Sequence, residues 1–258
     1  MALLLANLAL IDLDGGRLGS CLHLVARALE STRANSEQVS KELAQYNSYS
    51  LLQRLGQGDR VPPVPDDLTA SYRSRAWLEA DAHRLLSSRL HLGRTRIRAL
   101  VDGESDPSER VDLLAEWILA EVDLGNGDFA LGMANELNEY WESATDRGKM
   151  RVRLVTCALE LLLPGPPSPD LERMIESNYD ELARIDWNFY AWRAARNRAV
   201  YLEKAGRRED ASEAWRFAHG LVKGLLASFS AGHAARAFEQ TPAIQAFYHD
   251  SRRTGGDQ

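Results

Sequence analysis

The sequence has few cysteines and no long apolar run, and each shortage argues against a class of protein. Cys21 and Cys157 are its two cysteines, far apart and within helix-like segments. That pattern predicts two buried thiols in a reducing compartment and not a disulfide framework. No apolar stretch approaches the roughly 20 residues that a membrane-spanning helix needs. Residues 1–16 carry no basic group before their apolar run and no cleavage-like motif after it, so a secretory signal is not indicated. We expect a cytoplasmic protein without a membrane partner.

An excess of positive charge is also missing. Lys and Arg number 31 against 37 Asp and Glu, and the formal net charge is -6. General nucleic-acid binders carry a basic face and a high pI, so the overall charge argues against that class. β-branched residues are sparse, whereas Leu, Ala, Arg and Glu dominate. This composition favours helix over strand and predicts an all-α chain.

Catalytic signatures are absent as well. The sequence has no P-loop, no glycine-rich dinucleotide turn and no G-x-S-x-G element. Glu79 and His83 stand four residues apart, as two metal ligands on one helix face would. No third ligand and no HExxH pattern accompanies them, so we interpret them as an ordinary helix-surface pair. We predict a non-enzymatic protein with no catalytic residue, no metal site and no cofactor.

The segment 190–225 gives the clearest structural signal, that of a helical hairpin. Two apolar segments with helical periodicity flank a turn at Gly206, where glycine tolerates the backbone conformation that ends a helix. Small residues recur at offsets of twelve and seven, where two antiparallel helices come closest. A single hairpin cannot bury its apolar faces, so similar neighbours are expected. The small-residue sets are Ala199, Ala211 and Ala218, then Ala9, Cys21 and Ala28, and in part Ala120 and Gly132.

Turn residues divide the rest of the chain into further helices. A proline-rich connector at 60–67 and a proline-rich turn at 164–170 interrupt the helical pattern. Pro107 is suited to a first helical turn after Asp106 or Ser105. We expect helices at 3–13, 18–29, 36–55, 68–92, 95–101, 110–124, 129–144, 150–163 and 171–185, the hairpin at 190–225, and short helices at 234–238 and 242–248.

The small-residue positions resemble those of the tetratricopeptide repeat, and 127–129 and 206–208 look like its inter-helix turn. The segment 236–247 is similar to the end of the repeat region in large bacterial signalling regulators. The resemblance implies one all-α domain at 1–250, with about five antiparallel hairpins stacked into a right-handed superhelix and an irregular part at 56–106. A flexible tail at 251–258 is expected to follow. The resemblance also implies a concave groove that binds a peptide or a partner domain, in bacterial signalling or regulation.

Three polar residues of the hairpin fall at groove-facing positions of that family. Arg193 and Arg196 offer planar forks suited to a carboxylate, and Asn197 can hold a peptide backbone. We therefore predict an acidic partner or a C-terminal carboxylate. A solvated basic face that pairs with Asp186 or Glu203 is the alternative interpretation.

Two more residues complete the predicted partner surface. Trp117 matches a groove-facing position and could anchor a partner, although a plain core role is the alternative. Asn7 lies in the first helix at 3–13, which is apolar on most of its circumference. A helix that is apolar nearly all round should be covered on every side. We expect either self-association through this helix or further structure that covers it; a helix that is simply poorly capped is the alternative.

The segment 83–98 is a local concentration of positive charge in an acidic chain. It could meet an acidic protein surface or nucleic-acid phosphates, which makes a nucleic-acid-binding helical repeat the alternative function. No aromatic residues are interleaved, which is a poor nucleic-acid signature, and a solvated helix face is the simpler interpretation. The predicted basic patch is Arg84, Arg89, Arg94, Arg96 and Arg98.

Overall fold

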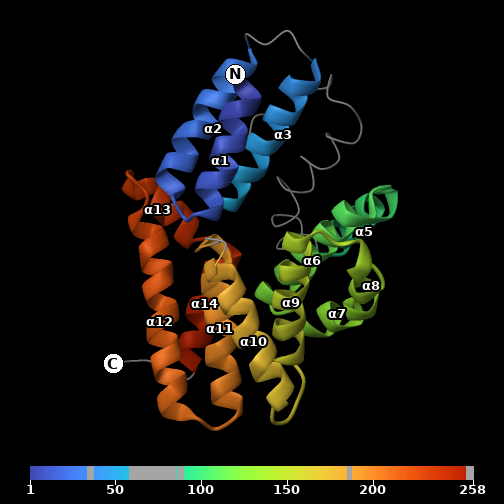
Figure 1. Cartoon of the computed structure of the whole chain (residues 1–258), viewed down its shortest axis with the longest axis vertical. Coiled ribbons are helices and arrows are strands. Elements are labelled where there is room, and N and C mark those ends of the chain that lie inside the picture. Colours follow the sequence, from blue (N-terminus) through green and yellow to red (C-terminus); the bar gives the residue numbers. More distant parts are fainter. Residues whose placement is uncertain (34–37, 58–85, 87–89, 185–187, 254–258) are drawn as a thin grey trace. The chain divides into compact units, whose positions relative to one another are not determined.

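The chain is helical wherever its structure is described. The structure is a computed structural model that describes residues 1–33, 38–57, 86, 90–184 and 188–253 (Figure 1). These residues form helices, turns and short connections, and none of them lies in a strand. The predicted all-α class is therefore confirmed.

Contacts along the backbone group the chain into two compact units, and the single domain expected at 1–250 stays a prediction. Unit 1 comprises Met1–Leu100 and Gly224–Thr241, and unit 2 comprises Val101–Lys223 and Pro242–Gln258. Two of the three boundaries fall within helices, so each unit holds part of α5 and part of α12. Each unit is described by itself below.

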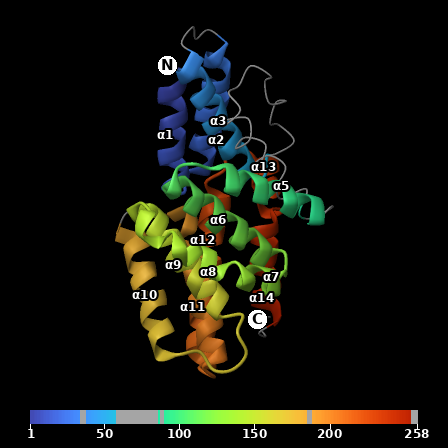
Figure 2. The same ribbon diagram turned by 90° about the vertical axis from the view of Figure 1, so that its right-hand side faces the viewer.

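Unit 1 is built on three helices that pack against one another. Helix α1 packs on both α2 and α3, and α2 packs on α3 (Figures 1 and 2). The first two helices are separated at Gly16, whose φ of 73° only glycine adopts readily. Among the described residues, the helices of unit 1 are α1 (Ala2–Asp14), α2 (Leu18–Thr32), α3 (Gln38–Arg54), α13 (Gly232–Glu239) and parts of α5 (Leu90–Gly103) and α12 (Arg208–Ala227).

Unit 2 holds the hairpin on which the sequence prediction centred. Helix α9 packs on α6 and α10, and α10 packs on α11. Gly206, with φ of 76°, forms the turn between α11 and α12. Besides its parts of α5 and α12, unit 2 contains α6 (Pro107–Asp123), α7 (Gly127–Gly132), α8 (Ala134–Glu139), the short 3-10 helix η2 (Trp141–Ser143), α9 (Asp146–Glu160), α10 (Pro169–Arg184), α11 (Asn188–Lys204) and α14 (Pro242–Arg253).

Local sequence signals explain several helix starts. The Asp106 side chain accepts a hydrogen bond from the Ser108 backbone N–H at the start of α6, and Pro107 takes the first helical position. Thr145 caps α9 in the same way through the Gly148 N–H. Such caps satisfy donors that the first turn leaves unpaired and stabilise a helix by about 1 kcal/mol.

The small-residue pattern is buried in two of its three copies. Ala199, Ala211 and Ala218 are almost completely buried, as are Ala9, Cys21 and Ala28. In the partial copy Ala120 is buried, but Gly132 is exposed. The spacing therefore predicts buried positions in α1, α2, α11 and α12 but not in α7.

Three helix predictions need correction. The helix expected at 129–144 is divided into α7, α8 and η2, because Gly132 and the asparagines of α8 are weak helix formers. Helix α5 is continuous from Leu90 to Gly103, although we expected an interruption at 93–94. Helix α14 continues to Arg253 with Ser251 buried, so the first residues assigned to the tail are helical. Most of the helix expected at 68–92, and residues 254–258, lie outside the described residues.

Both cysteines are free and buried, as predicted, and each lies in a different unit. Burial raises the pKa of the Cys21 thiol to about 12, and the nearby Asp12 and Asp14 charges add to the shift. Burial likewise raises the pKa of Cys157 to about 12. Neither thiol is therefore ionised appreciably near neutral pH in the folded chain.

We predict that each thiol reacts with a thiol reagent only when its own unit opens. In Cys157→Ala the remaining Cys21 should report on unit 1, and in Cys21→Ala the remaining Cys157 should report on unit 2. Labelling rates measured across a urea series should rise steeply at each unit's unfolding transition, because unfolding exposes the thiol and returns its pKa to the usual range. Fast labelling of either variant without urea would contradict the burial described here.

Candidate functional site

Arg193 and Arg196, two of the predicted partner contacts, meet the buried carboxylate of Asp123 at the end of α6. Its side chain has 0% exposure. The guanidinium of Arg193, on α11, binds it with both arms: Nη1 donates to Oδ1 at 3.1 Å and Nη2 donates to Oδ2 at 2.6 Å. Nη1 of Arg196 donates to Oδ1 as well, at 3.1 Å. A paired fork of this kind is among the stronger polar contacts in proteins.

Arg196 also holds a second carboxylate, that of Asp250 on the C-terminal helix α14. Its Nε and Nη2 both donate to Oδ2 of Asp250, at 2.9 and 2.6 Å. The side chains of Arg193 and Arg196 are only 14% and 12% exposed, whereas that of Asp250 is 28% exposed. Arg196 therefore links α6, α11 and α14 through one side chain.

The charges of this cluster balance. Burial by itself lowers the pKa of Arg193, but the charge of Asp123 and its hydrogen bonds outweigh that effect, so the pKa is raised. Two guanidinium groups face two carboxylates, which is the condition under which buried charges are tolerated. We call Asp123, Arg193, Arg196 and Asp250 the arginine site.

Helix α14 is also anchored by an aromatic side chain. Phe247 is completely buried, and its ring lies 5.7 Å from the rings of both Trp192 and Trp215 and 4.8 Å from that of His219. Burial and the nearby Lys223 charge lower the pKa of His219. The ring of Trp192 also lies 4.7 Å from the Arg193 guanidinium. Two residues of α14, three positions apart, therefore anchor this helix. Asp250 pairs with Arg196 of α11, and Phe247 packs against side chains of both α11 and α12.

A second polar cluster continues along α6, α9 and α11. Arg151 lies between two carboxylates of α6, 3.3 Å from Asp112 and 3.6 Å from Glu116. The Tyr190 hydroxyl donates to Glu116 at 2.6 Å, and the Arg151 guanidinium lies 5.5 Å from the Tyr190 ring. The charged side chains of α6 and α9 are thus paired with one another in this cluster.

The structure brings two of the five predicted partner contacts together, Arg193 and Arg196. Asn197 is buried, and its Nδ2 donates to the Leu154 carbonyl of α9 at 3.1 Å. Trp117 lies in the core of unit 2, where its Nε1 donates to Glu121 and its ring packs 5.7 Å from Phe129. Asn7 belongs to unit 1 and accepts a hydrogen bond from Asn47 at 3.3 Å. The assignment of all five to partner binding stays a prediction.

The predicted basic patch is described only in part. Arg84 and Arg89, and the Glu79 and His83 pair, lie outside the described residues. Arg94, Arg96 and Arg98 lie on α5, and each already has an interaction of its own. Their arrangement adds no argument for nucleic-acid binding.

Asp123, Phe247 and Asp250 were not among the site residues predicted from the sequence. The pattern of Phe247 followed three residues later by Asp250 was visible on an amphipathic segment, but the segment was expected to end at 248. Nothing in the sequence connected Asp123 to arginines 70 and 73 positions away. Asp123 becomes a buried ion-pair partner only when the folded chain brings α6 and α11 together.

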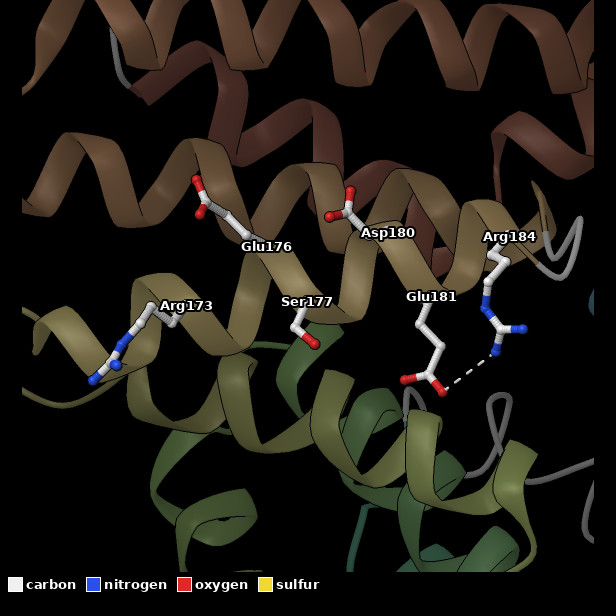
Figure 3. A pocket seen from close by; sticks show the side chains of 6 residues that line it. All are labelled: Arg173, Glu176, Ser177, Asp180, Glu181 and Arg184. Atoms are coloured by element: carbon white, nitrogen blue, oxygen red, sulfur yellow. Dashed lines mark ion pairs between the residues drawn. The ribbon is translucent and has the colours of Figure 1, made fainter.

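Helix α10 carries a shallow, open depression whose polar side chains are spread along one helix (Figure 3). Glu181 is 2.5 Å from Arg153 and 4.0 Å from Arg184, and Glu176 is 3.9 Å from Arg198. These are surface ion pairs of the kind that contribute little energy. The depression is lined by Arg173, Glu176, Ser177, Asp180, Glu181 and Arg184.

Within the described ranges, no three His, Cys, Asp or Glu side chains gather as metal ligands would. In those same parts of the chain, no helix combines the length and apolar character needed to cross a membrane. The arginine site accordingly remains the best-defined polar arrangement on which to base a function.

We predict that the two carboxylates of the arginine site differ strongly in their contribution to stability. Asp123→Asn should lower the free energy of unfolding by about 3–5 kcal/mol, because it leaves buried guanidinium groups without their counter-charge. Asp250→Asn should cost about 1 kcal/mol, since that carboxylate is partly hydrated. Urea unfolding followed by tryptophan fluorescence measures both. Equal, small losses would mean that water reaches Asp123.

The chain matches no protein-family model, no curated protein and no solved structure. The likeness to tetratricopeptide repeats therefore stays a prediction from residue spacing. The helical class and the geometry of the arginine site are what the structure adds to it.

Proposed function

We propose that this chain is a non-enzymatic protein-interaction module, and that unit 2 binds an amphipathic helix of its partner in the place that α14 occupies. The proposal takes α6, α9 and α11 as first helices of successive hairpins in a tetratricopeptide-like superhelix. The packing of α9 on α6 and α10, and of α10 on α11, supports this stacking.

The observation that carries the proposal is the contact between Arg196 and Asp250. A carboxylate from a separate helix at the end of unit 2 fills the arginine fork with two hydrogen bonds. An acidic partner is predicted to make the same contact between a carboxylate and a guanidinium, which Asp250 of the chain itself makes here. Helix α14 would thus act as a resident occupant with which a partner competes.

Charge balance explains why the site would select a carboxylate. If α14 leaves, Arg196 keeps its contact with Asp123 but loses its contact with Asp250, so the arginine site gains a net positive charge in a largely buried place. Guanidinium groups in such surroundings strongly favour a new carboxylate partner. The space vacated by Phe247 between Trp192 and Trp215 would favour an aromatic side chain three residues before that acid.

A peptide with the sequence of residues 242–253 tests this proposal. Because the same helix competes from within the chain at high effective concentration, the wild-type chain should bind the labelled peptide weakly. Asp250→Asn weakens the internal competitor by about 1 kcal/mol, so apparent affinity for the wild-type peptide should rise about fivefold. Fluorescence anisotropy measures both affinities.

Two controls make the comparison specific. A peptide carrying Asp250→Asn should lose the gain, because it cannot supply the carboxylate. A chain carrying both Asp250→Asn and Arg196→Gln should lose it too, because the fork is gone. The proposal fails if Asp250→Asn leaves peptide affinity unchanged, or if the altered peptide binds as tightly as the original.

A further inference from the structure

Helix α1 has an apolar face that nothing described in unit 1 covers. Its inner face is buried against α2 and α3, through Ala2, Leu5, Ala6, Ala9 and Leu13. Its outer face is apolar as well, although helices that are apolar all round are normally buried on every side. The exposed fractions on that face are 80% for Met1, 57% for Leu4, 41% for Leu8 and 57% for Ile11. We call these four residues the α1 stripe.

The spacing of the α1 stripe is that of a helix-pairing seam. Its members follow one another at intervals of three, four and three residues, which places them on one line along the helix. Asn7 borders this line and is bonded to Asn47 of α3. The α1 stripe is therefore a single line of apolar side chains along the helix, against which a second helix can pack.

We infer that a second copy of this chain covers the α1 stripe, with the two α1 helices packed antiparallel. In that arrangement Met1 meets Ile11 and Leu4 meets Leu8, and each pairing is the same from either copy. Such self-complementarity is what a two-fold dimer requires. The seam contains no charged side chain, so two copies do not repel each other along it.

Charges at the helix ends favour the antiparallel direction. Asp12 and Asp14 lie in the last turn of α1, where the helix dipole disfavours acids, and Arg17 offsets the Asp12 charge in part, with its Nε 2.8 Å from Asp12 Oδ1. The first turn has no acidic residue and no side-chain cap. In an antiparallel pair the acids of one copy lie beside the uncapped first turn of the other, which stabilises both ends. A parallel pair would place acids beside acids.

A lipid surface is a poorer occupant than a second copy. Helices that lie on membranes usually carry Lys or Arg beside their apolar face. Residues 1–16 contain no basic side chain, and the next residue, Arg17, is already paired with Asp12 at 2.8 Å. Four side chains in each copy make a smaller interface than the roughly 800 Å² per partner of stable complexes, so the dimer should be weak, with a dissociation constant in the micromolar range.

Sedimentation equilibrium over two decades of concentration tests the inference. The wild-type chain should pass from monomer to dimer, and Leu8→Glu should raise the dissociation constant at least tenfold by placing a charge in the seam. Leu163→Glu is the matched control: it adds the same charge at a leucine of unit 2 that is 48% exposed, and it should dimerise as the wild type does. Circular dichroism confirms that each variant is folded.

Disulfide trapping tests the direction of packing. A mixture of Leu4→Cys and Leu8→Cys chains should form mixed disulfides faster than either variant forms disulfides with itself. Faster pairing of each variant with itself would overturn the antiparallel arrangement. A wild-type chain that stays monomeric throughout, or that is recovered with lipid vesicles while remaining monomeric, would overturn the dimer. Neither result affects the peptide measurements on unit 2.

Discussion

A carboxylate that has no contact with water constrains unit 2 more than any other group described there. Removing Asp123 from solvent costs several kcal/mol, which only nearby positive charge and hydrogen bonds can offset. Arg193 and Arg196 supply both, and Arg196 in turn engages Asp250. The positions of α6, α11 and α14 are therefore coupled, because moving any one of them leaves a charge without its partner.

Buried ion pairs add little net stability compared with apolar packing, but they penalise wrong arrangements heavily. Helix α11 shows how the two contributions are divided. Its fully buried Ala199 lies in the hydrophobic core, while Asn197 donates to a carbonyl of α9 and its arginines hold α6 and α14. Apolar burial supplies the driving force for packing this helix, and its polar contacts fix its register against several neighbours.

The sequence predicted those features that depend on neighbouring residues. Gly206 and Pro107 mark helix boundaries because their backbone properties act locally, and the Ala199, Ala211 and Ala218 spacing follows from helix geometry. The surroundings of Arg193 could not be predicted in this way. Whether an arginine faces solvent or a buried acid depends on a residue 70 positions away, and helical periodicity carries no information about it. The division of 129–144 was not predicted, because each weak helix former lowers the stability of a helix only slightly. Only their combined effect ends the helix.

The two proposed interaction surfaces depend on opposite physical forces. At the arginine site, specificity comes from charge, because a partner must replace the carboxylate that Asp250 provides. The more exposed these charged groups are, the more strongly salt weakens their attraction. The α1 stripe has no charge along its seam, so its association depends on apolar area and should persist or strengthen in salts that favour burial. Ionic strength would therefore shift the balance between them. At high salt, pairing through α1 would be retained while carboxylate binding at the arginine site weakens, so the two surfaces can be studied separately in one protein.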